Sequence, residues 1–292
     1  MTISPHQRTK CFLSTIEDEL IGLREKLHAV PEVGLNLPQT YSLVKNEFEK
    51  LGMEIHESSR VSGFVAILRG GASSSLIPRP LVLLRADMDA LPLEEETQLP
   101  FASTNGAMHA CGHDMHMAGI IGAARALSEV KDELSGDILF FLQPGEEGED
   151  GAQFLIDEGL LEAAGRLPDF AYGLHVWSAN YPHGSITSRA GALMASSDVI
   201  RLTVKGKGGH GSAPYLAKDP VPIVAEMITQ AQVMVAREFN IFDPVVMTCG
   251  KVSAGDAPNI IADTAHAEFT LRAFSDEARA ELIHKSTEDR KS

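Results

Sequence analysis

Residues 137–148 read Asp-Ile-Leu-Phe-Phe-Leu-Gln-Pro-Gly-Glu-Glu-Gly, an apolar run that leads directly into Pro-Gly and two adjacent glutamates. A continuous apolar run of this kind is typical of a strand that is buried on both faces of its sheet. Because Pro and Gly end the run, Glu146 and Glu147 are expected at the carboxyl end of that strand. Ligands of α/β sheets gather at such ends. This stretch therefore predicts both the fold class and the place of the site.

Strands and helices alternate along the chain around this stretch. Ser14 and Glu17 have the spacing of a capping box, which predicts the start of the first helix, and Pro31 ends it. The expected elements are, in order, helices at 16–30 and 38–52, strands at 61–68 and 81–84, a helix at 115–130, the strand at 137–142, a helix at 151–161 and a strand at 170–176. This alternation predicts a layered α/β domain.

The alternating pattern ends near residues 185–193, which predicts a first domain at 1–187 and a second at 188–292. The second domain is expected to contain a strand at 197–204, a glycine-rich loop at 206–211, a helix at 219–237, strands at 245–252 and 260–274, and a helix that begins at Ser275. This order resembles a ferredoxin-like α+β module that stops one strand short. We expect both domains to be incomplete at the C-terminus.

Composition narrows the class of protein. The chain has 292 residues with 44% hydrophobic content, and its formal net charge of -15 argues against nucleic-acid binding. We therefore expect a small-molecule substrate and no nucleic acid. Three scattered cysteines fit a reducing compartment, and Met1–Lys10 lacks the apolar core of a signal peptide. Since no apolar run is long enough for a membrane span, the sequence predicts a cytoplasmic protein without a membrane partner.

Four side chains have the chemistry of a transition-metal site. Cys111 and His113 lie in the segment 108–114, and Glu147 and His175 each follow an expected strand. A thiolate, two imidazoles and a carboxylate are ligands that divalent transition metals accept. Glu146 is left over as a base that can take a proton from a water beside the metal.

Asp87 and Asp89 follow the expected strand at 81–84. They are expected to accept the second N–H of a ligating imidazole, which would fix its tautomer. A lone histidine is more often an ordinary core or surface residue than a ligand. We interpret five histidines in this way, namely His6, His28, His56, His266 and His284, and leave three undecided, namely His109, His116 and His183.

Gly206, Gly208 and Gly211 match the spacing of the dinucleotide fingerprint. That fingerprint requires a helix to open directly at the loop. Residues 212–216 and two prolines intervene here, so a dinucleotide site is not expected. His210 lies between glycines in this loop, and either an ordinary loop histidine or a residue that approaches another surface fits the pattern.

Five motifs in this order resemble the M20 metallopeptidase family. They are Arg85–Pro92, Met108–His113, Gln143–Gly148, Gly173–His175 and Gly208–Pro214. The resemblance runs from the first helix to Phe274 and is strongest to amidohydrolases that cleave N-acyl amino acids, such as hippurate hydrolases and auxin-amino acid conjugate hydrolases. It implies a layered α/β/α metallohydrolase catalytic domain with an inserted ferredoxin-like lid domain.

The resemblance also implies roles for individual residues. Cys111 resembles a thiolate that bridges two divalent ions, zinc or manganese, and His113, Glu147 and His175 resemble further ligands. Glu146 resembles the general base. His210 resembles a lid residue that reaches the active site of a partner subunit, which implies a homodimer formed through the lid. Asn259 and Arg272 fall near lid positions that hold a substrate carboxylate.

Relatives carry a further strand, a return to the catalytic sheet and one more metal-binding histidine near the C-terminus, so the resemblance implies a truncated chain. The expected function is metal-dependent hydrolysis of the amide bond of N-acyl amino acids. A dipeptidase or aminopeptidase of the same family is one alternative. A catalytically impaired remnant that dimerises or binds is another. The acyl group and the amino acid stay open.

Overall fold

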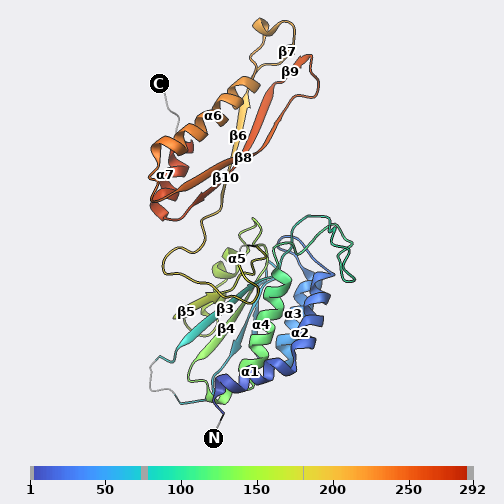
Figure 1. Ribbon diagram of the computed structural model, residues 1–292, viewed down its shortest axis with the longest axis vertical. Helices are drawn as coiled ribbons and strands as arrows, with labels where there is room; N and C mark the ends of the chain where they lie inside the picture. The colour runs from blue at the N-terminus through green and yellow to red at the C-terminus, as the bar shows by residue number, and fades with distance from the viewer. Residues whose placement is uncertain (1–2, 74–77, 180, 288–292) are drawn as a thin grey trace. The chain divides into compact units, whose positions relative to one another are not determined.

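The computed structural model describes residues 3–73, 78–179 and 181–287. The chain divides into two compact units, Met1–Tyr181 (unit 1) and Pro182–Ser292 (unit 2), which are blue to olive and olive to red in Figure 1. The sequence predicts this boundary slightly later, after residue 187. Across the described residues, no helix combines the length and the apolar character that a membrane crossing requires.

Unit 1 contains a five-stranded sheet in the order β1-β2-β4-β3-β5. The strands are β1 (Glu54–Glu57), β2 (Phe64–Leu68), β3 (Leu81–Asp87), β4 (Asp137–Gln143) and β5 (Phe170–Gly173). β3 runs parallel to both β4 and β5, with Asp87 opposite Gln143 and Arg85 opposite Gly173. The carboxyl ends of these three strands therefore meet at one edge of the sheet.

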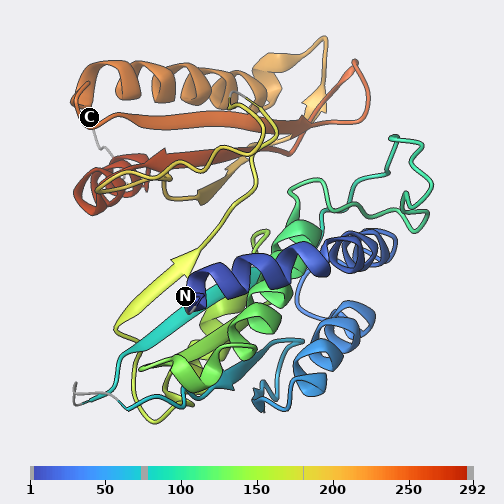
Figure 2. The same ribbon diagram turned by 60° about the horizontal axis from the view of Figure 1, so that its bottom comes forward.

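Helices cover both faces of this sheet. They are α1 (Pro5–Thr15), α2 (Glu17–His28), α3 (Pro38–Lys50), α4 (His113–Ser128) and α5 (Gly151–Asp157). One core cluster joins α2, α3 and α4 to one face of the strands, and a second joins α5 to the other face. Figure 1 shows α2, α3 and α4 beside one another. Figure 2 shows α1, in dark blue, on the side of α4. The layered α/β fold that the sequence predicts is confirmed.

Two elements of unit 1 differ from the expectation. The helix α1 precedes the predicted first helix, and its capping box is formed by Ser4 and Gln7. Ser14 lies inside α1, where its hydroxyl donates to the carbonyl of Lys10, so the predicted capping box of Ser14 and Glu17 is wrong. The helix α1 buries no residue, and β1 is short and carries charged ends, so neither has the apolar periodicity that reveals an element in the sequence.

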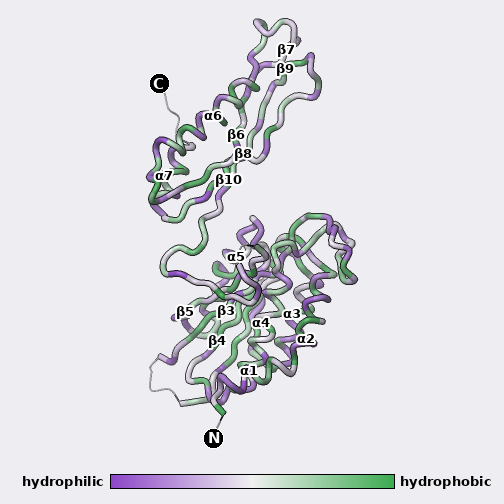
Figure 3. Tube along the Cα trace, in the orientation of Figure 1, coloured by the Kyte–Doolittle hydropathy of each residue, from purple (hydrophilic) through white to green (hydrophobic). Residues whose placement is uncertain are grey.

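Unit 2 contains a three-stranded antiparallel sheet in the order β6-β10-β8. Its elements are β6 (Asp198–Lys205), β7 (Gly209–His210), α6 (Val221–Glu238), β8 (Val245–Ala254), β9 (Ile260–Ile261), β10 (Thr264–Ala273) and α7 (Asp276–Thr287). α6 and α7 pack on one face of the sheet. The predicted strand at 260–274 is divided into β9, which pairs with β7, and β10. Figure 3 shows in green the apolar residues that lie along the strands of both units.

Candidate metal centre

The candidate ligands converge because they follow parallel strands or open the helix beside them. Cys111, His113 and His175 each offer a ligand atom within 4.8 Å of the others, and so do His113, Glu146 and Glu147. The structure therefore brings the predicted ligands together in two overlapping groups that share His113. Glu147 falls in the group with Glu146, and the group of Cys111 and His175 does not include it.

His113 has the environment of a metal-binding imidazole. Its Nδ1–H donates to the backbone carbonyl of Asp89 at 2.8 Å, which leaves Nε2 as the free acceptor. This Nε2 is buried, and it has no hydrogen-bond partner among the described residues. Carboxylate oxygens of Asp87, Glu146 and Glu147 lie 3.6, 3.8 and 4.0 Å from it. A buried nitrogen without a partner is rare, and here it faces the side chains that would share a cation with it.

Gly112 allows the side chains of Cys111 and His113 to lie on the same side of the loop, near His175. Its φ of 86° favours glycine, and a Cβ at this position would lie 2.3 Å from Cγ2 of Val176. The segment that carries His175 can therefore pass close to the backbone here. As a result, Sγ of Cys111 lies 3.4 Å from Nε2 of His175. The Nδ1 of His175 lies 2.7 Å from the carbonyl of Val176, which leaves Nε2 directed at the thiol.

Asp89 holds the two glutamates. It is fully buried, and its carboxylate oxygens accept the backbone N–H groups of Glu146 and Glu147, each at 2.9 Å. The predicted contact from Asp89 to a ligating imidazole exists, but a different atom makes it. The backbone carbonyl of Asp89 binds His113, whereas its carboxylate is occupied by the glutamate loop and lies 3.8 Å away.

Asp87 binds an imidazole that the sequence left undecided. Its Oδ1 accepts from Nδ1 of His116 at 2.6 Å, and its Oδ2 pairs with Arg85. Burial alone would raise the pKa of Asp87, but the hydrogen bond from His116 and the charge of Arg85 lower it to about 2. The Nε2 of His116 accepts the N–H of Val176 at 2.9 Å. Both nitrogens of His116 are therefore used, and this side chain fixes the segment after β5 in place of ligating.

Burial and a neighbouring carboxylate disfavour the charged forms of Cys111 and Glu146. Burial, followed by the nearby carboxylate of Glu147, raises the pKa of the Cys111 thiol to about 12. Burial and Glu147 also raise the pKa of Glu146. The side chain of Glu146 is 41% exposed, so it is accessible to solvent and substrate. A divalent cation among these groups would favour the thiolate and the carboxylates, and the set of donors fits such an ion.

In unit 2, two of the three predicted lid residues lie together. His210 pairs with Ile260 across β7 and β9, and the carbonyl of Asn259 accepts the N–H of Gly211 at 2.8 Å. Arg272 lies eight positions beyond Thr264 along β10, roughly 26 Å at the rise of a strand. The structure therefore does not bring Arg272 to His210 and Asn259 within this unit.

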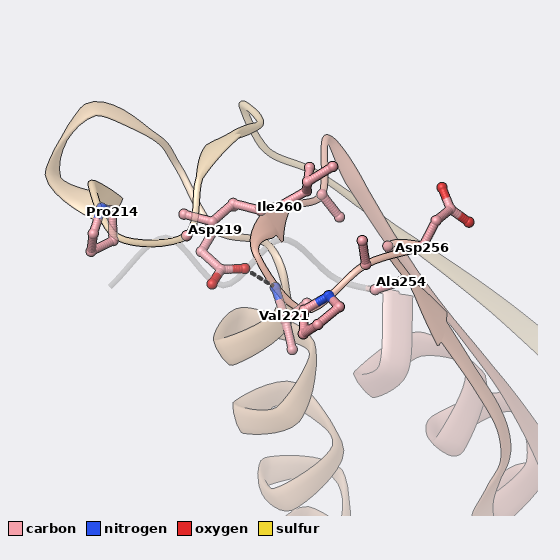
Figure 4. Close-up of a pocket in the computed structure, with 12 residues that line it drawn as sticks. Pro214, Asp219, Val221, Ala254, Asp256 and Ile260 are labelled. Atoms are coloured by element: carbon pink, nitrogen blue, oxygen red, sulfur yellow. Dashed lines mark hydrogen bonds between the residues drawn. The ribbon is translucent and has the colours of Figure 1, made fainter.

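The loop beside Asn259 borders a pocket of about 550 Å³. Figure 4 shows Ala254, Asp256 and Ile260 on one side of it and Asp219 and Val221 at the start of α6 on the other. The carboxylate of Asp219 accepts the N–H of Val221 at 3.0 Å. The first α-helix after the glycine-rich loop 206–211 is α6, which begins only at Val221, whereas the dinucleotide fingerprint requires such a helix directly at the loop.

Comparison with known proteins gives the family. The profile of peptidase family M20/M25/M40 matches residues 83–289. The chain is 37% identical over 274 residues to the N-acetyl-L-cysteine deacetylase of Bacillus subtilis (strain 168), a match that covers 92% of this chain and 63% of the relative. It is 38% identical over 274 residues to IAA-amino acid hydrolase ILR1-like 5 of Arabidopsis thaliana, with 92% and 60% covered.

A solved structure agrees with these matches. The Bacillus subtilis YXEP protein, described as a dinuclear metal binding peptidase from the M20 family, has a TM-score of 0.72 and 32% identity, with 94% of this chain and 68% of that chain covered. The α/β fold is thus shared with a known class of metal-binding peptidases. The chain belongs to peptidase family M20/M25/M40, which confirms the resemblance, and it spans 63% and 60% of the length of the two curated relatives.

Proposed function

We propose that the protein is a metal-dependent amidohydrolase that cleaves the amide bond of N-acyl amino acids. One observation carries the proposal beyond the family, namely the buried Nε2 of His113 that faces Glu146 and Glu147 without a hydrogen-bond partner among the described residues. The names of the two curated relatives, a deacetylase of N-acetyl-L-cysteine and a hydrolase of IAA-amino acids, favour an acylated amino acid as the substrate.

Cys111, His113, Glu147 and His175 are the proposed ligands of two divalent ions, zinc or manganese. Since the one free nitrogen of His113 can bind only one ion, the proposal of a second ion rests on the related YXEP protein, which is described as dinuclear. When bound, such ions lower the pKa of a coordinated water and polarise the carbonyl of the substrate.

Glu146 is the proposed general base. Its side chain is 41% exposed and its carboxylate lies 3.8 Å from Nε2 of His113, so it can contact a water beside the proposed ions. It takes the proton of the attacking water and returns it to the leaving amine. Asp89 keeps this role separate from that of Glu147, because it fixes both backbone N–H groups and so sets the direction of both side chains.

Unit 2 is the proposed lid and dimerisation unit. His210 and Asn259 are adjacent, so they can contact one substrate together, and His210 is proposed to stabilise the developing oxyanion in the site of a partner subunit. Arg272 is proposed to bind a substrate carboxylate. Because Arg272 lies far along β10 from the other two residues, it and His210 cannot serve the same substrate from one copy of unit 2.

The test compares Glu146→Gln with Glu149→Gln, a matched change at an exposed glutamate of the same loop. Glu146→Gln should retain the bound metal and lose at least about 100-fold in turnover, the range that general acid–base catalysis contributes. Glu149→Gln should leave both unchanged. Metal content by elemental analysis and turnover on N-acetyl and N-benzoyl amino acids give the two readouts. Full turnover in Glu146→Gln would refute the assignment of the base.

A peptidase is the second candidate, favoured by the description of the YXEP protein. The same panel, extended with dipeptides, decides between the two, because a dipeptidase needs the free amino group that an N-acyl amino acid lacks. A chain that binds no metal and turns over none of these compounds would support the third alternative, a catalytically impaired protein that binds or dimerises.

A further inference from the structure

A chain of buried charges lies behind the candidate metal ligands. Asp114 is the residue directly after His113, in the first turn of α4. Its Oδ2 lies 2.8 Å from Nδ1 of His28 and 2.7 Å from Nε of Arg24, both of which come from α2. The other ring nitrogen of His28 lies 3.0 Å from the carboxylate of Glu95. The side chains of Asp114 and Glu95 are fully inaccessible to solvent, and that of His28 is 4% exposed.

His28 joins two buried carboxylates. Its two ring nitrogens lie against Asp114 and Glu95, and the guanidinium of Arg24 lies against Asp114 as well. Burial of unpaired charges is costly, so each of these carboxylates depends on its partners.

These buried side chains contact both segments that lead into the metal centre. Glu95 accepts the backbone N–H of Ser103 at 2.7 Å, and the segment that follows pairs Met108 with Leu91 before it reaches Cys111. Asp114 continues directly from His113. The ring of His113 is held from the opposite side by the carbonyl of Asp89.

We propose that His28 is a positioning residue for the metal centre: by bridging Asp114 and Glu95 it fixes the segment that carries Cys111 and His113. The inference rests on the proposed metal site. Metal sites depend on ligand positions to within about 0.5 Å. Without His28, the buried carboxylate of Asp114 has one hydrogen-bond partner fewer, so the first turn of α4 moves to hydrate it, and the two ligands move with that turn.

The test uses Co²⁺ as the probe and the whole chain. His28→Gln and the milder Glu95→Gln are compared with Arg125→Gln. Arg125 lies on the same helix as Asp114, further from the ligands, and pairs with Glu47 and Glu19. Three quantities are measured, namely the Co²⁺ dissociation constant, the thiolate-to-Co²⁺ charge-transfer absorption that reports on Cys111, and the thermal unfolding midpoint of the metal-free protein.

His28→Gln should weaken Co²⁺ binding by about 10- to 100-fold, the range for residues that orient ligands, and should reduce or shift the absorption band. Glu95→Gln should act in the same direction. Arg125→Gln should lower the unfolding midpoint and leave the dissociation constant and the band unchanged.

Three results would overturn the inference. Wild-type affinity and an unchanged band in His28→Gln, with only a lower midpoint, would show that His28 acts on stability alone. If His28→Gln does not fold, the same result in Glu95→Gln has the same meaning. Absence of Co²⁺ binding by the wild type would overturn the proposed metal site itself, which separates failure of the function from failure of the positioning role.

Discussion

Replacement of Asp89 by asparagine should loosen the glutamate loop while it preserves the shape of the side chain. In the wild type, two carboxylate oxygens accept the N–H groups of Glu146 and Glu147, each at 2.9 Å, at a fully buried position. An asparagine offers one oxygen and one NH₂ group, so one of the two backbone donors then faces another donor.

The cost can be worked out from these contacts. Loss of one hydrogen bond to a charged group costs about 1.5–3 kcal/mol when its buried donor is left without an acceptor. The remaining bond is weaker because its acceptor is neutral. We therefore expect Asp89→Asn to reduce the free energy of unfolding of unit 1 by about 2–4 kcal/mol.

Urea unfolding of the metal-free protein measures this change. Fluorescence of Trp177, the one tryptophan of the chain, reports on unit 1, since its ring lies 6.3 Å from that of His175. Asp169→Asn is the control, because Asp169 accepts the N–H of Leu81 at 2.8 Å with a side chain that is 38% exposed. Water can replace that bond, so the control should lose less than about 1 kcal/mol. A loss below about 1 kcal/mol in Asp89→Asn would refute the reasoning.

Two further predictions concern the ligand loop. Gly112→Ala should weaken metal binding and lower the unfolding midpoint, because it combines a positive φ with a 2.3 Å approach to Val176; equal metal affinity in Gly112→Ala, measured by titration, would contradict the proposed geometry. The pKa of Cys111 is raised to about 12 in the folded, metal-free protein, so the stability linked to this thiol is present below about pH 8.5 and is lost as the pH rises toward the folded value. Between about pH 8.5 and pH 12, the free energy of unfolding of the metal-free protein should therefore fall less steeply in Cys111→Ser than in the wild type. Urea unfolding at several pH values measures this, and identical curves for the two proteins would count against the raised pKa.

The sequence predicts those parts of the site that local pattern controls. Glu146 and Glu147 follow an apolar strand, and the strand end fixes their place in the sheet, so their position was predictable. The parallel pairing of β3 with β4 and β5 then brings His175 to the same edge. Periodicity and turn residues in the sequence predict where each strand ends. Each of these site residues comes directly after such an end, so its position can be read from the sequence.

Other parts of the site depend on pairs that are remote in sequence. The sequence indicates an ordinary histidine at position 28, yet His28 binds Asp114, 86 positions away. The sequence leaves the role of His116 open, although this residue lies one turn after His113 and binds the strand-end residue Asp87. Such contacts produce no periodic pattern in the sequence. They depend on how the helices pack on the sheet and on which buried carboxylates need a hydrogen-bond partner there.

The contrast between Asp87 and Cys111 indicates where positive charge is needed. Both lie near His113, yet the pKa of Asp87 is lowered while that of Cys111 is raised. The difference arises because Arg85 and His116 stabilise the negative charge of Asp87. At Cys111, burial and the carboxylate of Glu147 are the dominant influences, and both disfavour the thiolate. The protein thus supplies counter-charges to Asp87, whereas burial and the carboxylate of Glu147 disfavour the thiolate of Cys111. A divalent cation bound beside Nε2 of His113 would supply positive charge where the thiol lacks it.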